Sequence, residues 1–356
     1  MGCSRIYVSV ILVCSLCISC ITDLEFAPDR DLENTVSIQA ILVKGDVHTI
    51  TVYTRKVRDF SGRNTPVLVQ TATLFNDRGQ SIKVPLVATG VNRLRIPADS
   101  PDFVVEDFMT FFVQVTTDDG RLFQSESEQL LPVPQIDLLR FELVQSLEVG
   151  PLNELILENQ VGFFVDTDAV IPNTSEALRL RWTFEEVYEV TDSPPPFLNR
   201  EPKTCYLVQE LGAVEEIIVD PADIGFTALR DWMIFERDIT FTYAEANHFV
   251  TMQHSLTPTA FEYFDAVRTV INRTGSAFDS PAGLVPTNFF NVDNPTEEVF
   301  GFFYATELDT ARVNVPREAV GPVARRCPPP RPNDEVCMDC LLGNRSSLTP
   351  PIWWTE

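Results

Sequence analysis

Cysteine is the residue type whose spacing carries the clearest chemical meaning in this chain of 356 residues, which contains eight of them. Four lie far from the N-terminus, at Cys205, Cys327, Cys337 and Cys340. If the chain is exported, four thiols most simply form two disulfide bonds, and three pairings are open. We favour a pairing that joins Cys205 to the C-terminal tail, because closing a long loop restrains the unfolded chain strongly.

Other chemistries are open to the same thiols. Cys337-Met338-Asp339-Cys340 has the inner spacing of a zinc site, although Cys327 lacks a close partner in sequence. A redox-active Cys-x-x-Cys pair would have to begin a helix, whereas this pair lies in a proline-rich tail. Free thiols are the remaining alternative. Disulfides explain the four cysteines most simply, and no metal site is predicted.

The first residues predict export. Residues 1–19 combine a weakly positive start with a mostly apolar stretch, 6–18, which is too short to span a bilayer and is typical of a signal peptide. The stretch leads into Ser19-Cys20, and a small residue before a cysteine resembles a bacterial lipoprotein cleavage site. We therefore predict that Cys20 is lipidated and attaches the chain to a membrane. An ordinary secretory signal cut near Ser19 is the alternative.

Few other residues have the spacing of a catalytic or metal site. His248 and His254, two of only three histidines, can share one face of a strand, but about 20 Å would separate them, too far for one metal ion. Asp166 and Asp168 lack the glycine turn and final glutamate of a calcium loop. Carboxylate pairs suited to glycoside hydrolysis are expected by chance among 51 acidic residues. The sequence therefore predicts no catalytic residue and no cofactor.

The charge balance bears on the choice of partner. The chain has 27 Lys and Arg against 51 Asp and Glu, a net charge of −24. Nucleic-acid binding and polybasic attraction to anionic lipid both require a basic surface, so neither is expected. Solubility through mutual repulsion is the simpler explanation of the acidity, and attraction of a cationic cargo is the alternative.

The pattern beyond the signal predicts a mainly β protein with two β-sandwich-like domains. Residues 20–34 are acidic and aperiodic, as in a flexible tether. Residues 35–131 alternate polar and apolar positions in short segments separated by turns, which indicates an immunoglobulin- or transthyretin-like sandwich. Prolines 132 and 134 interrupt this pattern and mark a domain boundary. Residues 135–356 are predicted to form a second β-rich domain whose proline-rich C-terminal tail is held by disulfides.

One amphipathic helix is predicted over residues 258–272 of the second domain. Thr257 is a suitable N-cap and Pro258 suits the first helical position. A stripe at helical spacing is expected to pack against a sheet, and it consists of Phe261, Phe264, Val267, Arg268 and Ile271.

Six stretches resemble one family in order and spacing over nearly the whole mature chain. They are TFFVQVTTDDGRLFQSES, LLPVPQIDLL, CYLV, HSLTPTAFEYFDAV, TGSAFDSPAGLVPTNFFNVDNPTEEVFGFFYAT and CMDCLLGN with the terminal PPIWW. The family is domain-of-unknown-function family 4249 of outer-membrane lipoproteins from Bacteroidota. The resemblance implies a lipid-anchored protein of the cell envelope, on the surface or the periplasmic side, often encoded beside a TonB-dependent receptor. It implies no established activity and no catalytic residues.

Together these features lead us to expect a non-enzymatic accessory or cargo-binding partner of a TonB-dependent receptor, with the cargo unspecified. An exported hydrolase that uses surface carboxylates is one alternative, and an envelope-structure or adhesion lipoprotein is another. The aromatic pair Trp353-Trp354 is expected to dock on the second domain, or else to contact a partner or a glycan. Asp309-Thr310-Ala311 resembles the short O-glycosylation acceptor of exported proteins in this phylum, which makes Thr310 a candidate site.

Overall fold

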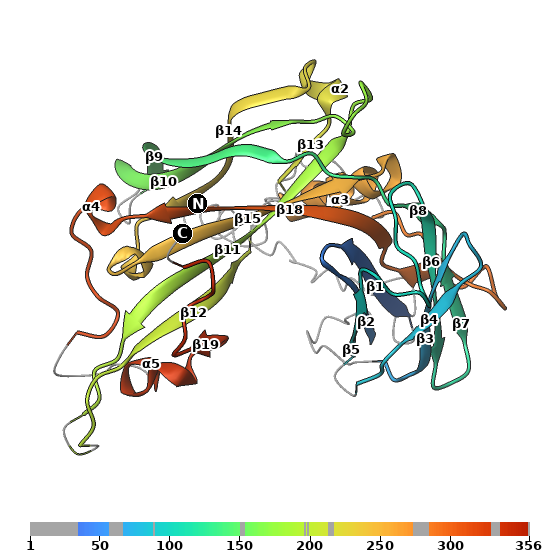
Figure 1. The fold of residues 1–356 in the computed structure, drawn as a ribbon, viewed down its shortest axis with the longest axis horizontal. Coiled ribbons are helices and arrows are strands. Elements are labelled where there is room, and N and C mark those ends of the chain that lie inside the picture. Colours follow the sequence, from blue (N-terminus) through green and yellow to red (C-terminus); the bar gives the residue numbers. More distant parts are fainter. Residues whose placement is uncertain are drawn as a thin grey trace, which may run out of the picture.

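The computed structural model describes residues 35–56, 67–87, 90–149, 154–195, 197, 199–212, 217–272, 285–328 and 335–354. The expected signal peptide 1–19 and the tether 20–34, with Cys20, lie outside these residues. The described chain is mainly β, as the alternating pattern predicts, and its strands form three sheets (Figure 1). Within the described ranges, no helix has both the length and the apolar character needed to cross a bilayer.

The largest sheet has ten strands and runs through most of the molecule. Its order is β19 (Ser346–Ser347), β12 (Thr204–Leu211), β11 (Arg179–Thr191), β15 (Asn247–Leu256), β18 (Phe303–Val315), β1 (Val36–Lys44), β2 (Val47–Lys56) and β5 (Val91–Pro97), with β13 (Ile217–Val219) beside β11 and β17 (Val299–Phe300) beside β1.

Two smaller sheets each cover part of the largest one. The six-stranded sheet contains β16 (Phe289–Asn291), β7 (Leu122–Ser125), β6 (Thr110–Thr117), β3 (Val69–Asn76) and β4 (Ser81–Val84), with β8 (Glu128–Gln129) beside β6. The three-stranded sheet contains β14 (Ala228–Asp238), β10 (Leu155–Asp168) and β9 (Ile136–Val149). The helical elements are α2 (Pro221–Ile224), η2 (Phe241–Tyr243), α3 (Pro258–Ile271), α4 (Arg317–Val320), α5 (Glu335–Met338) and η3 (Cys340–Leu342).

The two resulting sandwiches share strand β18. Its residues Phe303 and Ala305 belong to the first core, together with strands β1 to β7, whereas Val315 belongs to the second core. β18 pairs in parallel with β1, placing Phe303 opposite Ala40, and β16 pairs with β7. Residues 289–305 therefore belong to the first sandwich. In the sequence they lie far beyond the expected domain boundary at 132–134, so the two sandwiches do not follow one another along the chain as expected.

A glycine makes this return possible. Gly301, between β17 and β18, has a φ of +110°, and a Cβ there would lie 1.9 Å from the carbonyl oxygen of Ile38 in β1. Both the backbone conformation and the close approach require a residue without a side chain. The close packing of this segment against β1 therefore requires glycine at position 301.

The predicted helix is present as α3. The hydroxyl of Thr257 accepts a hydrogen bond from the backbone N–H of Ala260, and Pro258 occupies the first turn. Phe261 and Phe264 are buried as expected, but the prediction for the end of the stripe is wrong, because Ile271 is 48% exposed. Packing is concentrated in the first two turns, where Tyr263 also stacks on Phe302.

Candidate functional site on one face of the largest sheet

The C-terminal tail is fixed to the edge strand β12 by a disulfide. Cys205 of β12 is bonded to Cys340, and Cys327 is bonded to Cys337 within the tail. The expected disulfides, including the link from Cys205 to the tail, are confirmed. The alternatives of a zinc site, a redox Cys337–Cys340 pair and free thiols are wrong, because all four sulfur atoms are used in these two bonds.

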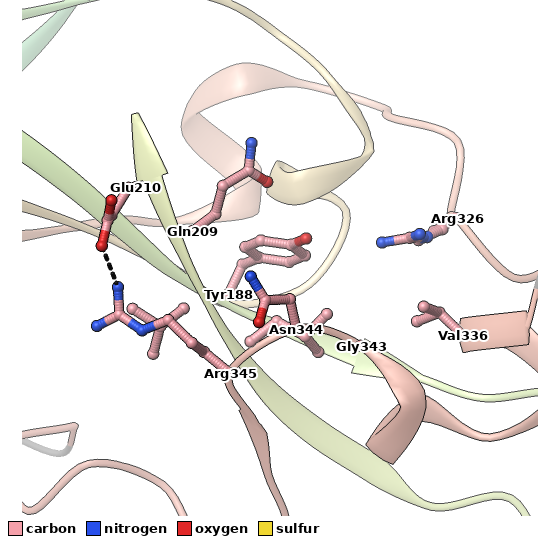
Figure 2. Close-up of a pocket in the computed structure, with 10 residues that line it drawn as sticks. Tyr188, Gln209, Glu210, Arg326, Val336, Gly343, Asn344 and Arg345 are labelled. Atoms are coloured by element: carbon pink, nitrogen blue, oxygen red, sulfur yellow. Dashed lines mark hydrogen bonds and ion pairs between the residues drawn. The ribbon is translucent and has the colours of Figure 1, made fainter. Parts of the chain in front are cut away.

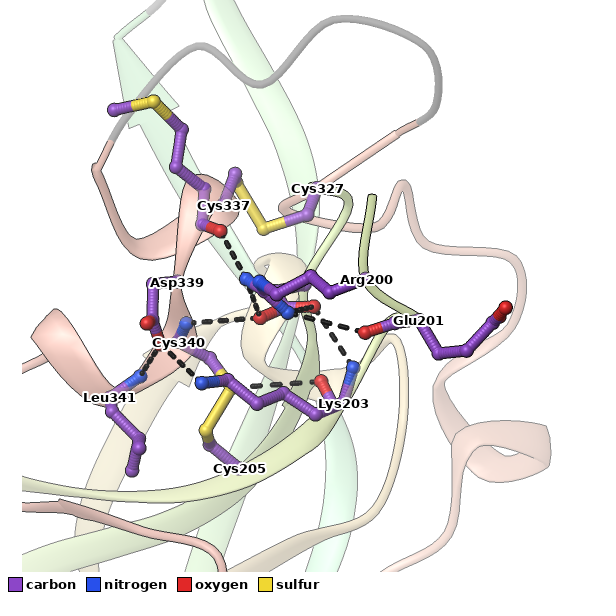
Figure 3. A network of polar contacts seen from close by, with 11 residues as sticks. Arg200, Glu201, Lys203, Cys205, Cys327, Cys337, Asp339, Cys340 and Leu341 are labelled. Atoms are coloured by element: carbon purple, nitrogen blue, oxygen red, sulfur yellow. Dashed lines mark hydrogen bonds and ion pairs between the residues drawn. A yellow bond between two sulfur atoms is a disulfide. The ribbon is translucent and has the colours of Figure 1, made fainter. Parts of the chain in front are cut away.

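A buried carboxylate strengthens this attachment, and Figure 3 shows the surrounding contacts of Arg200, Lys203 and Cys340. Asp192, which is 2% exposed, accepts hydrogen bonds from the guanidinium of Arg200 at 2.8 Å, from the backbone N–H of Lys203 at 2.9 Å and from that of Cys340 at 3.3 Å. The ammonium of Lys203 lies 2.7 Å from the carboxylate of Asp339 and lowers its pKa. Charge-assisted bonds to a buried acceptor are strong, so this network holds the tail in one geometry.

The tail then pairs with the edge of the sheet. Ser347 of β19 lies opposite Tyr206 of β12. The side chain of Arg345 forms ion pairs with Glu185 at 2.8 Å and with Glu210 at 3.0 Å. An uncovered edge strand invites association with other chains, and the tail removes that exposure here.

A pocket of about 450 Å³ lies between β12 and the tail (Figure 2). Tyr188 lies between Arg326 and Arg345 in this view, and burial, together with the nearby Glu186 carboxylate, raises the pKa of its phenol. Arg345 is engaged by Glu210, and the guanidinium of Arg326 lies 5.2 Å from the ring centre of Phe241. These cationic side chains attach the tail, so we regard this pocket as structural.

Beyond β19 the tail brings its two tryptophans against the sheet. The ring of Trp354 lies 4.3 Å from the ring of His248 and 4.9 Å from that of Tyr206. Trp353 lies 5.5 Å from His248, and the guanidinium of Arg312 lies 4.9 Å from its ring centre. Both indole rings thus dock on the second sandwich, and both remain partly exposed.

A second aromatic group lines a pocket of about 400 Å³ between α3 and the sheet. Tyr263 and Phe264 come from the helix, and Tyr304 comes from β18. The guanidinium of Arg181 lies 4.2 Å from the ring centre of Phe264, and Gln39 of β1 donates a hydrogen bond of 3.3 Å to the hydroxyl of Tyr263. Ligand sites are commonly of this size and combine aromatic walls with a few polar groups. We call it the aromatic pocket.

His254 forms part of the wall of the aromatic pocket. Its Nε2 lies 2.9 Å from the hydroxyl oxygen of Thr183, and burial, together with the charge of Arg181, holds its pKa well below the ordinary value. A hydroxyl next to an imidazole can act as a nucleophile with its base when a third group orients the imidazole. Among the described residues, however, the Nδ1 of His254 has no hydrogen-bond partner. Within the described residues, the arrangement therefore lacks that third group.

The tryptophans and the aromatic pocket lie on the same face of the sheet. β15 pairs without interruption with β11 on one side and β18 on the other, so alternate residues from His248 to His254 point to one face. Six residues of strand separate these histidines by about 20 Å. Between them lie Thr183, Met252 and Thr310 in one row of cross-strand neighbours. We call this surface the aromatic face.

The structure places the remaining sequence candidates as follows. Thr310, the candidate for O-glycosylation, lies in the middle of the aromatic face, and the carboxylate of Asp309 accepts a hydrogen bond of 2.7 Å from the backbone N–H of Ile136. Asp166 accepts a hydrogen bond from the backbone N–H of Asp231, and Asp168 pairs with Arg230 at 2.6 Å. No cluster of three or more metal-binding side chains occurs in the part of the chain that the structure describes.

Several residues of the aromatic face were absent from the sequence candidates, among them three with polar side chains. Arg181 and Thr183 lie on β11, and Arg312 lies on β18. In the sequence, these three residues are marked only by their alternation with apolar residues of the same strand. Their partners across the sheet depend on register, which the sequence does not state.

The sandwiches, the disulfide-bound tail and the aromatic face define a mainly β protein with two disulfides. The profile of the family described as "Domain of unknown function (DUF4249)" matches residues 21–312. The chain belongs to this family. The match includes Arg181, His254 and Arg312 and ends before the tail that carries the tryptophans. No curated protein shows significant similarity to the chain.

Proposed function

We propose that the protein is a non-enzymatic outer-membrane lipoprotein that binds cargo for a TonB-dependent receptor in nutrient uptake. The observation that carries this proposal is the aromatic face. One surface holds the partly exposed tryptophans at one end and the aromatic pocket of about 400 Å³ at the other, and the polar side chains between them can orient a ligand. Cys20 would supply the lipid anchor, and a flexible tether over residues 20–34 would reach tens of ångströms, enough to place the face over a neighbouring barrel.

One observation favours an enzyme as the second candidate. The hydrogen bond between Thr183 and His254 has the spacing of a nucleophile and its base. A base with a strongly lowered pKa is a weak proton acceptor near neutral pH, which counts against this role. Binding without turnover fits these groups better.

Extraction of the native lipoprotein from outer membranes with mild detergent tests the proposal. We expect a stable complex with a receptor barrel, seen as coelution and as a second band identified by mass spectrometry. The matched control is Cys20→Ala, which should lose both the membrane fraction and the complex. A lipoprotein that elutes alone and turns over members of a glycan or peptide panel would instead support the enzyme.

A further inference from the structure

We propose that the cargo is a neutral linear oligosaccharide that lies along β15, with one end against Trp353 and the other in the aromatic pocket. This inference rests on the proposed function and names the chemical class of the cargo. Its starting point is the fixed separation of the two aromatic groups. His248 lies under the tryptophans and His254 lines the pocket, about 20 Å apart on the same face of one strand.

The backbone of this face favours a ligand recognised through side chains. Every residue of β15 from Asn247 to His254 pairs with β11 on one side and with β18 on the other. An extended peptide that adds to a sheet needs a strand edge with free N–H and C=O groups, which β15 lacks. Rings with one apolar surface can instead lie flat on aromatic side chains, and sugars have such rings.

Both ends of the face pair an aromatic ring with a guanidinium, but only the tryptophan end exposes its ring. At one end the guanidinium of Arg312 lies over Trp353, and at the other that of Arg181 lies over Phe264. The tryptophan end therefore places a partly exposed ring next to a planar group with several hydrogen-bond donors, whereas Phe264 is 6% exposed and the other end offers a cavity lined by Arg181. A sugar ring presents the matching combination, an apolar surface with hydroxyl groups around its rim.

The charge of the face also suits a neutral ligand. Arg181, Arg312 and Arg345 are offset by Glu185 and Glu189 of β11 and by Glu210, which lies opposite Glu185 on β12. The face therefore offers donors and acceptors in balance, whereas the whole chain carries a net charge of −24. A hydroxyl group donates and accepts, so it can use both kinds of side chain. A polyanion would be repelled by the protein as a whole.

Isothermal titration calorimetry of the full mature protein in detergent tests this inference. The probes are linear neutral oligosaccharides of glucose, mannose or xylose, from disaccharides to longer oligomers. Within one series we expect affinity to rise with length until the oligomer spans about 20 Å, and then to level off, because bridging both ends makes the second contact intramolecular.

Variants at the two ends should separate the contacts. Trp353→Ala should weaken binding of long oligomers about tenfold or more, as loss of an aromatic anchor does, and Trp353→Phe should restore part of the affinity. Thr183→Val should also weaken long oligomers. A disaccharide held at one end should respond to one of these variants only. Phe226→Ala, which removes an exposed ring that contacts Trp232, is the control and should change nothing. Peptide mapping without reductant should show both disulfides intact in each variant.

Three results would overturn the inference. The first is equal affinity for disaccharides and long oligomers, and the second is unchanged binding by Trp353→Ala. The third is that no neutral oligosaccharide binds while the receptor complex still forms, whether or not the face binds peptides or acidic oligosaccharides. In that last case the proposed function stands and the cargo class is wrong. If oligosaccharides bind but no receptor complex forms, the cargo class is right and the proposed function is wrong.

Discussion

The carboxylate of Glu128, on strand β8 of the first sandwich, accepts a hydrogen bond of 2.7 Å from the hydroxyl of Thr257, the residue that caps helix α3. It also accepts one of 2.8 Å from the hydroxyl of Thr259 in the first turn of that helix. The helix lines the aromatic pocket on the largest sheet. Glu128 thus connects the first sandwich to one wall of the candidate binding site.

We predict a pH dependence that Glu128 controls. Burial raises its pKa above the ordinary value of 4.5, although its hydrogen bonds with Thr257 and Thr259 act in the opposite direction. The folded state therefore favours the protonated acid. Its contribution to stability is complete below the unfolded pKa and is lost as pH rises through the raised folded pKa.

Glu128→Gln removes this titration and keeps the shape of the side chain. In urea unfolding at a series of pH values, the free energy of unfolding of the wild type relative to this variant should increase from neutral pH toward 4.5. The contributions of titratable groups that both proteins share cancel in this difference between their free energies of unfolding. A difference that stays constant with pH would show that Glu128 titrates normally.

We predict that Phe264→Ala destabilises the protein by about 3–5 kcal/mol, as truncation of core aromatics does. The full chain should be used, because β18 belongs to both sandwiches. Ile271→Ala on the same helix is the matched control, since that side chain is 48% exposed, and it should cost less than about 1 kcal/mol. Thermal and urea unfolding measure both. An unchanged melting temperature for Phe264→Ala would mean that the helix is a binding surface and not a support.

The two disulfides should differ in their contribution to stability. Cys205–Cys340 closes a separation of 135 residues and Cys327–Cys337 one of 10 residues. In the chain-entropy account the first is worth about 4–5 kcal/mol and the second about 3 kcal/mol. We therefore expect the double variant Cys205→Ser/Cys340→Ser to unfold at lower denaturant than Cys327→Ser/Cys337→Ser. Mass spectrometry without reductant should find no free thiol among the four in the wild type, and alkylation of all four without denaturant would contradict the pairing.

Cys20→Ala tests the anchor. We predict an unprocessed or soluble periplasmic protein that no longer incorporates labelled palmitate, because the lipidated thiol is gone. Fractionation of cells and palmitate labelling measure this outcome, and protease treatment of intact wild-type cells shows on which side of the membrane the protein lies. A variant that still labels and still fractionates with the outer membrane would exclude lipidation at Cys20.

Local features of the fold could be predicted because their causes are local. Alternation along residues 36–44 indicates β1, and Thr257 with Pro258 indicates the start of α3. The parallel pairing of β1 with β18 joins Ala40 to Phe303 across more than half of the chain, and no short-range pattern announces it. The prediction that Ile271 is buried was wrong for a related reason, since its burial depends on which sheet residues lie opposite the end of the helix.

The candidate site could be predicted only in parts. Strand periodicity places His248 and His254 on one face, and the four cysteines indicate a fixed tail. The meeting of Trp354 with His248 requires the tail to be attached through Cys340 and to pair with β12, so it follows from the fold as a whole.

The central claim is that the aromatic face holds its ligand without changing it. Incubation of the mature protein with the neutral oligosaccharide series, followed by native mass spectrometry of the complex and chromatography of the free sugars, tests this most directly. We predict a complex of one protein with one intact oligosaccharide, lost in Trp353→Ala, and complete recovery of the added sugar. Shortened oligosaccharides that disappear with Thr183→Val would contradict the claim and make the protein an enzyme.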